Sequence, residues 1–357
     1  MWNPFQKLFS GKSFLGIDIG TSYIKMVQIS KLGHRKKLEN YGSLPASVLH
    51  EKPFRTFEKS TLLLSNQEIA TAIKAIIQEA EIKTKQAVFS IPDFSTFFTS
   101  FELPPMTKEE LPQAVKYEAR QHIPLPLAEV TLDWQVIESR LLDDKKISFK
   151  ILLAAVPNEV VGQYQEIARL SQLELIALEA EVFSLMRSLI RENGQEPVAI
   201  LDIGSQSTTC SIINEKLLKM SHSFNISGNE FTKVISKGLN IDYFEAEKLE
   251  KEHGLKGKKE VKEILLPLVD IILKETEIIL NNSYQKGGPE IRKMILAGGW
   301  ALLPGLKEYF TENLKISAEI ANPFSDILYP SILEKTLTKM GPGFAIAVGV
   351  ALRGLEA

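Results

Sequence analysis

The sequence has few of the residues that form crosslinks or bind metals. It contains one cysteine, Cys210, among 357 residues, so an internal disulfide is excluded and a reducing compartment is expected. Cys210 lies in an apolar, strand-like run, which favours a packing role over a reactive one. The five histidines show no metal-ligand spacing. The chain also lacks the Gly-x-x-x-x-Gly-Lys phosphate loop and the nucleophile-elbow serine of hydrolases.

Neither sign of charge dominates, and long hydrophobic runs are absent. With 42 basic and 44 acidic residues the net charge is −2, so no general attraction to nucleic acid is expected. No apolar run approaches the roughly 20 residues that a membrane-spanning helix needs, and the N-terminus lacks the features of a signal peptide. Together with an apolar fraction of 44%, these absences predict a cytoplasmic globular protein, whose length is typical of about two to four domains.

The N-terminal segment leaves two interpretations open. Trp2, Phe5, Leu8 and Phe9 fit one face of a short helix beside two lysines, a pattern typical of an interfacial membrane anchor. The same side chains also fit a hydrophobic lead-in that docks on the first strand or frays.

The most informative feature that is present is a hairpin sequence that occurs twice, at 15–22 and at 199–207. Each copy is an apolar run that ends in Asp-x-Gly and a hydroxyl residue, followed by a second strand-like run. Glycine lets the backbone approach a ligand closely, and the N–H groups of such a turn form an anion-binding nest. The strand-end carboxylates Asp18 and Asp202 suit Mg²⁺ or its waters. One such turn is common in hairpins, but two predict a nucleotide clamped between duplicated domains.

The periodicity of apolar residues places these hairpins in an alternating α/β pattern. Asn66 is the expected N-cap of a helix in the first half. The segment 86–159 is interpreted as a compact β-β-α-β-β unit inserted into that half, and Gly194-Gln-Glu-Pro197 is the clearest linker. The strands expected at the start of the two halves are 14–19, 23–30 and 37–44, then 198–203, 208–213 and 217–226.

The order of the motifs resembles the actin–Hsp70–sugar kinase ATPase superfamily over essentially the whole chain. The two hairpins are similar to its phosphate loops, 179–183 to its connecting segment, 296–306 to its adenosine motif and 341–354 to its closing helix. Within the superfamily, 115–133 and 340–353 resemble the PilM family of type IV pilus assembly proteins and, more distantly, the FtsA family of division proteins. The glycine loops specify only the superfamily, whereas the last two segments specify the PilM family.

The resemblance implies an actin/Hsp70-like duplicated α/β fold with a small insertion domain of the SHS2 type in the first half. The domains that it implies are a first actin-like subdomain at 1–85, completed by 160–194 and the C-terminal helix 341–357; the insertion domain at 86–159; a second actin-like subdomain at 195–240 and 285–340; and a smaller helical subdomain at 241–284.

The resemblance also implies a site for ATP and Mg²⁺ between the two halves. Asp18 and Asp202 are expected to hold the metal, mainly through waters. Glu179 or Glu181 is the candidate for orienting the attacking water, although either also suits a helix start, where a carboxylate complements the helix dipole. The residues expected to contact the nucleotide are Gly20, Thr21, Ser22, Lys25, Gly204, Ser205, Gln206, Ser207, Gly228, Glu247, Lys248, Gly298, Gly299 and Trp300.

Several of these residues have a plain structural alternative. Lys25 also fits a solvent-facing strand lysine, and Glu247 and Lys248 fit the surface charge of an amphipathic helix. Trp300 departs from the superfamily pattern, in which a small or polar residue is commoner after the glycine pair, so its indole either stacks on the base or crowds the pocket. The aromatic strand at 94–101 is interpreted as core of the insertion, with a partner groove as the alternative.

The function that the resemblance implies is a cytoplasmic ATP-binding adaptor of type IV pilus biogenesis with at most weak hydrolysis, at the inner face of the inner membrane. Its expected partner is the cytoplasmic N-terminal peptide of a PilN-like membrane protein, laid in an apolar groove at the insertion and its junction with the first domain. Other pilus motor components and further copies of the chain are secondary partners.

Two alternatives remain: a self-assembling actin-like ATPase, and an FtsA-like division or membrane-anchoring protein. The tail Leu355-Glu-Ala357 carries no terminal amphipathic helix, which counts against the FtsA-like alternative. A sugar or acetate kinase is least favoured, because no substrate-specific motif is present.

Overall fold

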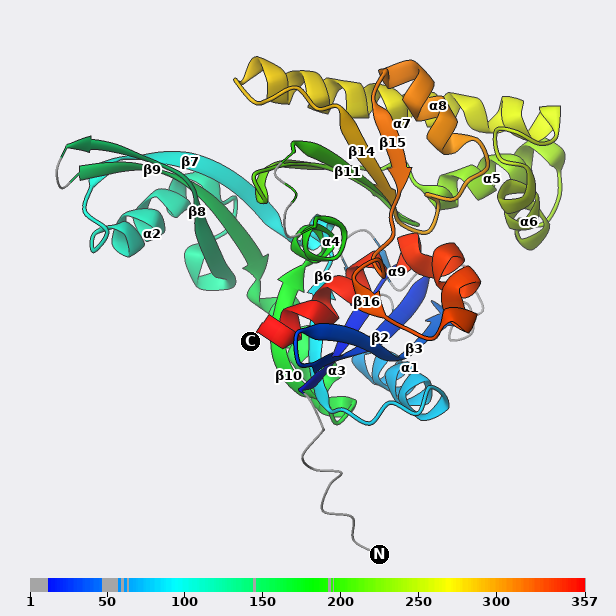
Figure 1. The fold of residues 1–357 in the computed structure, drawn as a ribbon, viewed down its shortest axis with the longest axis horizontal. Helices are drawn as coiled ribbons and strands as arrows, with labels where there is room; N and C mark the ends of the chain where they lie inside the picture. The colour runs from blue at the N-terminus through cyan, green and yellow to red at the C-terminus, as the bar shows by residue number, and fades with distance from the viewer. Residues whose placement is uncertain are drawn as a thin grey trace, which may run out of the picture.

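A computed structural model describes residues 12–46, 57–58, 61–62, 64–143, 146–191, 194 and 196–356. The N-terminal aromatic segment, with its two interpretations, lies outside these residues. Figure 1 shows two α/β halves, one above the other, with a smaller sheet extending to one side.

The first half is built on a six-stranded sheet with the strand order β10-β6-β1-β2-β3-β16. The neighbours β1, β2 and β3 form an antiparallel meander, whereas β6 is parallel to β1 and β10 is parallel to β6. Six of the seven residues of β1 are buried, as expected for a strand covered on both faces. The strands are β1 (Ser13–Ile19), β2 (Tyr23–Leu32), β3 (Arg35–Pro45), β6 (Gln86–Ile91), β10 (Glu174–Ala180) and β16 (Ile327–Leu328).

Helices cover both faces of this sheet. Apolar side chains of α1 (Asn66–Glu79) and α3 (Asn158–Leu170) pack on one face with Ile17 and Met26, and α9 (Glu334–Glu356) packs on the other with Val27. The N-cap of α1 is Ser65 and not Asn66. Ser65 caps the helix because it forms a capping box with Glu68. The Glu68 backbone N–H donates to the Ser65 hydroxyl oxygen, and the Glu68 carboxylate accepts from the Ser65 N–H at 2.7 Å.

The second half repeats the hairpin plan in a five-stranded sheet with the order β13-β12-β11-β14-β15. Asp202 lies opposite Thr209 in the second hairpin, as Asp18 lies opposite Lys25 in the first. Cys210 is buried in an interior strand of this sheet and has a neighbouring strand on each side. The strands are β11 (Val198–Ile203), β12 (Thr208–Asn214), β13 (Leu217–Phe224), β14 (Lys293–Ala297) and β15 (Ser317–Ile320).

Four helices pack on the second sheet or beside it, and their apolar residues share one core with β11, β12 and β14. They are α5 (Gly228–Leu239), α6 (Tyr243–His253), α7 (Lys259–Gln285) and α8 (Leu306–Leu314). Along the described ranges, no helix combines the length and the apolar composition that crossing a bilayer requires. The remaining short elements are β4 (Phe57–Glu58), β5 (Thr61–Leu62), η3 (Asp93–Ser95), η4 (Leu127–Glu129) and η5 (Ser331–Leu333).

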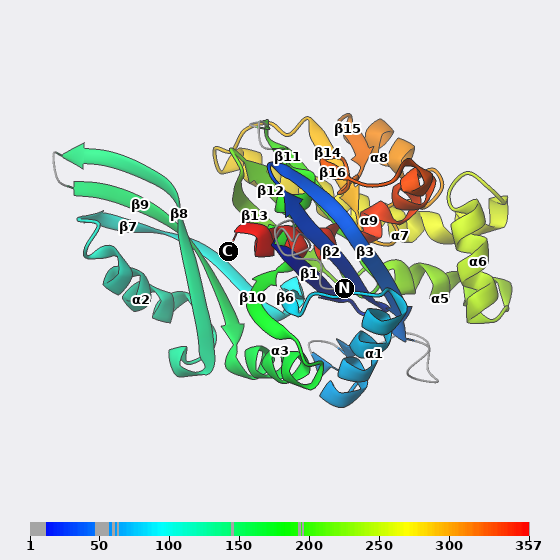
Figure 2. The same ribbon diagram turned by 60° about the horizontal axis from the view of Figure 1, so that its bottom comes forward.

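The insertion is a three-stranded antiparallel sheet, in the order β7-β9-β8, that packs on α2 (Leu111–His122). Figure 2 shows this sheet projecting from the two halves. The first strand of the expected β-β-α-β-β unit is not part of it, because β6 pairs with β1 in the main sheet and five of its six residues are buried there. The strands of the insertion are β7 (Phe97–Met106), β8 (Val130–Asp143) and β9 (Lys146–Pro157).

The aromatic residues of β7 divide between two environments. Phe101 is part of the insertion core against α2, as expected. Phe98 instead meets Phe183 of α4 (Glu181–Leu189) edge to face, with ring centroids 6.0 Å apart. The strand therefore serves both the insertion core and the junction with the first half.

Glycines allow α9 to approach its neighbours at backbone distance. A Cβ atom at Gly349 would lie 2.0 Å from the carbonyl oxygen of Ser184 in α4, and one at Gly16 in β1 would lie 2.0 Å from the carbonyl oxygen of Ala347. About one turn earlier in α9, Ala345 and Ile346 pack against residues of the second half. The helix thus contacts both halves at once, and Figure 1 shows it between them.

We expect Gly349→Ala to lower the free energy of unfolding by more than about 2 kcal/mol, because the added methyl has no room beside Ser184. The control is Gly162→Ala in α3, where a Cβ meets no atom within 4 Å and alanine favours the helix by up to about 1 kcal/mol. Urea unfolding followed by circular dichroism measures both. Equal stability of the two variants would contradict the close approach.

Candidate functional site

The two duplicated hairpins face each other across a cavity of about 130 Å³. The Thr21 hydroxyl of the first hairpin lies 3.5 Å from Gln206 Oε1 of the second, so the two turns meet. The cavity is lined from both halves. The predicted site residues that line it are Asp18, Gly20, Thr21, Ser22, Lys25, Glu181, Asp202, Gly204, Ser205, Gln206, Ser207, Glu247, Gly298, Gly299 and Trp300.

Backbone groups lie close to Gly20, Gly204 and Gly298 in the turns around the cavity. The N–H of Gly20 donates to Tyr23 at 3.0 Å, and the N–H of Gly204 donates to Ser207 at the same distance. At Gly298, where φ is +87°, a Cβ would lie 2.6 Å from Asp202 Oδ1. The hydroxyl of Ser22 is buried and has no hydrogen-bond partner among the described residues. This lining, with its open hydroxyl and compact turns, fits the phosphates of a nucleotide.

Two carboxylates beside these turns, the buried Asp18 and the half-buried Asp202, lie close to the Lys25 ammonium group. Lys25 Nζ lies 3.4 Å from Asp18 Oδ2, because the two residues are opposite each other on β1 and β2. Burial raises the pKa of Asp202 to about 6; the charge of Lys25 opposes this shift and that of Asp18 adds to it. Asp18 also accepts from Ser90 Oγ at 3.1 Å. A divalent cation with its waters matches this donor set, since it would stabilise both carboxylates in their charged form.

A second pair of acids joins the cavity to the base of the insertion. Glu181, the first residue of α4, accepts from the backbone N–H of Asp93 at 3.1 Å, and Asp93 accepts from the N–H of Val182 at 3.2 Å. Burial raises the pKa of Asp93 to about 7. Burial also raises the pKa of Glu181 well above its usual range, and the charges of Asp93, Asp18 and Asp202 add to that shift. Asp93 thereby caps α4 from a distant segment. Sequence reasoning missed it, because Pro92-Asp93 has the composition of an ordinary turn.

Three predicted site residues lie outside the cavity lining. Glu179 is in the extended strand β10, so its side chain diverges from that of Glu181; it accepts from Ser184 at 2.9 Å and pairs with Arg187. A water-orienting role for Glu179 in this cavity is therefore not supported. Gly228 lies beneath the Trp300 ring and does not reach the cavity surface.

Lys248 also does not line the cavity, and Lys251 of α6 does. Lys251 pairs with Glu247 at 2.7 Å, four residues earlier on the same helix face. The signal that identifies Lys251 is thus helical spacing from Glu247, whereas Lys248 follows Glu247 directly and points along another face.

A separate groove of about 370 Å³ lies between the insertion and the first half. One wall is a face of the insertion sheet, on which Leu152, Ala154 and Val156 alternate with core residues of β9. Opposite them in register on β8 are Gln135, Asp133 and Thr131. The residues of the facing wall include Ile91, Val161, Leu178, Glu179, Ala180, Phe183, Arg187 and Arg353.

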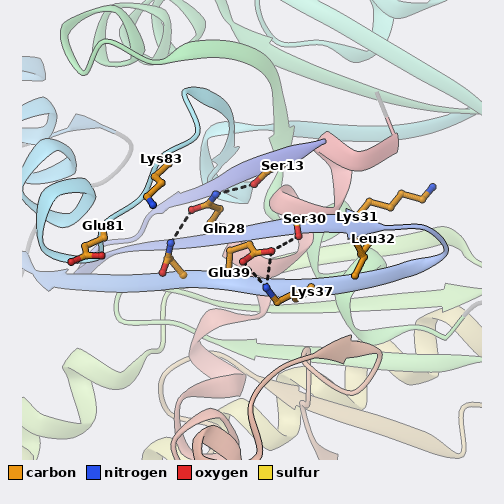
Figure 3. Close-up of a pocket in the computed structure, with 10 residues that line it drawn as sticks. Ser13, Gln28, Ser30, Lys31, Leu32, Lys37, Glu39, Glu81 and Lys83 are labelled. Atoms are coloured by element: carbon orange, nitrogen blue, oxygen red, sulfur yellow. Dashed lines mark hydrogen bonds and ion pairs between the residues drawn. The ribbon is translucent and has the colours of Figure 1, made fainter. Parts of the chain in front are cut away.

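Another cavity, of about 470 Å³, lies over β1, β2 and β3 and is drawn in Figure 3. Its polar groups bond to one another: Gln28 donates to Ser13 at 2.9 Å, and Lys37 pairs with Glu39 at 2.9 Å. Figure 3 shows these contacts along the strands. These four side chains are thus engaged with one another.

Comparisons with known proteins agree with this architecture. Residues 16–355 match the profile of the family described as Type IV pilus assembly protein PilM. A chain of the PilM-PilN type IV pilus biogenesis complex superposes with a TM-score of 0.84 and 25% identity, over 96% of this chain and 98% of that chain. MreB5 of Spiroplasma citri bound to ADP has a TM-score of 0.55 and 14% identity, over 96% of this chain and 95% of that one, which shows a shared fold alone.

A curated relative is the cell division protein FtsA of Enterococcus faecalis (strain ATCC 700802 / V583). It is 21% identical over 348 residues, which cover 85% of this chain and 78% of FtsA. The expected actin-like fold is therefore confirmed. The family profile extends from the first hairpin through the closing helix, and on that ground the chain belongs to the PilM family of type IV pilus assembly proteins.

Proposed function

We propose that the protein is an ATP-binding adaptor of type IV pilus biogenesis that binds the cytoplasmic N-terminal peptide of a PilN-like inner-membrane protein. The observation that carries this proposal is the groove between the insertion and the first half, in a chain similar to one in a PilM-PilN complex. The peptide would hold the protein at the inner face of the inner membrane.

The groove suits an extended apolar segment. Leu152, Ala154 and Val156 present a strip of small and medium apolar side chains on one wall. On the other wall, β10 pairs only with β6 within the described residues, so one of its edges offers backbone N–H and C=O groups. A peptide that adds to this edge would gain main-chain hydrogen bonds and insert alternate side chains into the groove.

The hairpin cavity is the proposed site of Mg-ATP. Asp18 and Asp202 would hold the metal, mainly through waters, and the turns at 20–22 and 204–207 would bind the phosphates. When bound, Mg²⁺ neutralises charge on the polyphosphate. Glu181 is the remaining candidate for orienting water, but burial and the neighbouring carboxylates raise its pKa well above the usual range, which favours the protonated form, and one of its oxygens already accepts from the Asp93 N–H. A protonated carboxyl is a poor proton acceptor, which supports weak hydrolysis at best.

The same few residues separate the two sites, which supports ATP as a switching ligand. Phe94 of η3 lines the hairpin cavity, and Thr96, directly after η3, lines the groove. At the start of α4, Glu181 lines the cavity and Phe183 lines the groove. A shift of η3 or α4 on nucleotide binding would therefore change the width of the groove.

The direct test is calorimetric titration with a labelled peptide that copies the cytoplasmic N-terminus of the neighbouring PilN-like protein, with and without Mg-ATP. Saturable binding supports the adaptor, and a difference between the two conditions measures the coupling of the sites. Absence of binding, together with nucleotide-dependent light scattering, would favour the self-assembling ATPase instead.

We expect Asp18→Asn and Asp202→Asn each to weaken Mg-ATP binding at least about tenfold, because each removes a charged metal ligand while keeping the side-chain volume. Calorimetry measures the affinity, and thermal unfolding checks that the variants are folded. In EDTA the variants and the wild type should bind ATP alike. Unchanged Mg-ATP affinity in both variants would refute the metal assignment.

We expect Ala154→Arg to weaken peptide binding at least about tenfold, because it places a long charged side chain in the middle of the apolar wall. The matched control is Gln113→Arg on the exposed side of α2, which adds the same side chain away from the groove. Fluorescence anisotropy of the labelled peptide measures both. Equal loss of affinity in the two variants would exclude this groove as the peptide site.

The buried acids predict a pH dependence of stability. Folding raises the pKa of Asp93 from 3.8 to about 7, so the folded state binds more protons than the unfolded state between these values, and stability falls as pH rises. In Asp93→Asn this loss is absent while an oxygen acceptor for Val182 remains. Relative to wild type, the variant should therefore gain at least about 1 kcal/mol between pH 5 and pH 8.

Urea unfolding in EDTA at the two pH values measures this gain. Asp326→Asn, at an exposed position, is the control and should show none. A gain of the same size in the control, or a loss in Asp93→Asn, would contradict the burial argument.

A further inference from the structure

Trp300 is fixed in the wall of the hairpin cavity. Its side chain is 9% exposed and packs directly on Gly228, where a Cβ would lie 2.0 Å from both Cδ2 and Cε2 of the indole. The backbone N–H of Trp300 also donates to Ile203 at the end of β11. The indole therefore has no space to swing toward α5.

A buried carboxylate holds the polar end of the ring. Trp300 Nε1 donates to Glu250 Oε1, and the Thr232 hydroxyl donates to Glu250 Oε2 at 2.5 Å. Glu250 is fully buried on α6. Each oxygen of this carboxylate is thus engaged by a neighbour, and so is the N–H of the indole.

The other polar side chains that α6 contributes to this wall are also engaged by a neighbour. Glu247 and Lys251, which line the cavity beside Trp300, are paired with each other at 2.7 Å. The turns at 20–22 and 204–207, by contrast, line the cavity with the Ser22 hydroxyl, which is buried and has no hydrogen-bond partner among the described residues. A donor suited to phosphate therefore remains at the first turn, whereas the indole N–H and the polar side chains of the α6 wall are engaged with one another.

The size of the cavity agrees with this division. At about 130 Å³ it is well below the roughly 300 Å³ or more of a pocket that encloses a whole drug-sized ligand. Such a volume suits phosphates and a hydrated metal. A nucleotide bound in this way would place its base at the mouth, against Trp300 and α6.

We infer that Trp300, locked by Glu250 and Gly228, makes this a polyphosphate site that accepts nucleoside triphosphates without discriminating among their bases. Strong discrimination needs a polar group that pairs with the edge of the base. The face of the indole offers none, because its N–H is held by Glu250, and every base has a face that can stack on it. The inference rests on the proposed nucleotide binding and specifies the class of ligand.

The test is competition calorimetry on the full chain with the magnesium complexes of ATP, GTP, CTP, UTP and tripolyphosphate. We expect the four nucleotides to bind within about threefold of one another, and tripolyphosphate within about tenfold of them. ATP binding more than about tenfold tighter than the other three would overturn the inference and leave nucleotide binding intact. Absence of binding by all five would instead refute the proposed nucleotide site, and the inference with it.

Two variants assign the effect to Trp300. In Trp300→Ser the wall is removed and Glu250 loses its indole partner, so its carboxylate can accept from a base; the nucleotide affinities should spread over more than about tenfold. In Glu250→Gln the side-chain oxygen still accepts from the indole, and the affinities should stay within about threefold. Thermal unfolding checks both variants. An unchanged spread in folded Trp300→Ser would overturn the role of Trp300, and the wild-type series decides the inference if that variant does not fold.

Discussion

The close approach of α9 to β1 and α4 is the contact on which the candidate site depends. The two hairpins that form the site belong to different halves and lie far apart in the sequence, so their separation is fixed by elements that contact both halves. Gly16 and Gly349 let α9 come to backbone distance of the first half, and Ala345 and Ile346 continue the packing into the second. The backbone of α9 also reaches the site directly, because the Gly298 N–H donates to the carbonyl oxygen of Pro342 at 3.0 Å.

A second constraint is the set of buried acids around the start of α4. Asp93 and Glu181 exchange hydrogen bonds with each other's segments, so the strand that leads into the insertion is tied to the helix that faces the cavity. Burial disfavours the charged form of both carboxyls, so each favours its neutral form. Under the proposed function, a charged ligand bound in the cavity would change that preference and so couple the cavity to the junction.

The sequence predicted those parts of the site that are local. Each hairpin is specified by a few consecutive residues, so Asp18, Asp202 and their turns could be recognised without the fold, and the structure brings them together. The family and the actin-like fold were likewise predicted from motifs and their order, and are confirmed. The roles of the individual site residues stay predictions.

The parts that sequence reasoning missed depend on contacts between distant segments. Asp93 caps α4 only because that helix begins beside it in the fold. The strand β6 was expected in the insertion, but it pairs with β1 in the main sheet. Glu179 and Glu181 are nearly adjacent in sequence, but a strand ends and a helix begins between them, so one faces the groove and the other the cavity. The sequence pattern alone does not show that the two side chains point to different sites.

The buried position of Cys210 makes the protein convenient to label. Its side chain is fully buried in β12, and burial raises the pKa of the thiol to about 12. Alkylating reagents attack accessible thiolates, so this thiol stays inert while the second sheet is folded. A cysteine engineered into the groove or beside a hairpin would then be the single reactive thiol of the folded chain. Alkylation of Cys210 itself would in turn measure the opening of the second half, because the thiol reacts only when it becomes accessible.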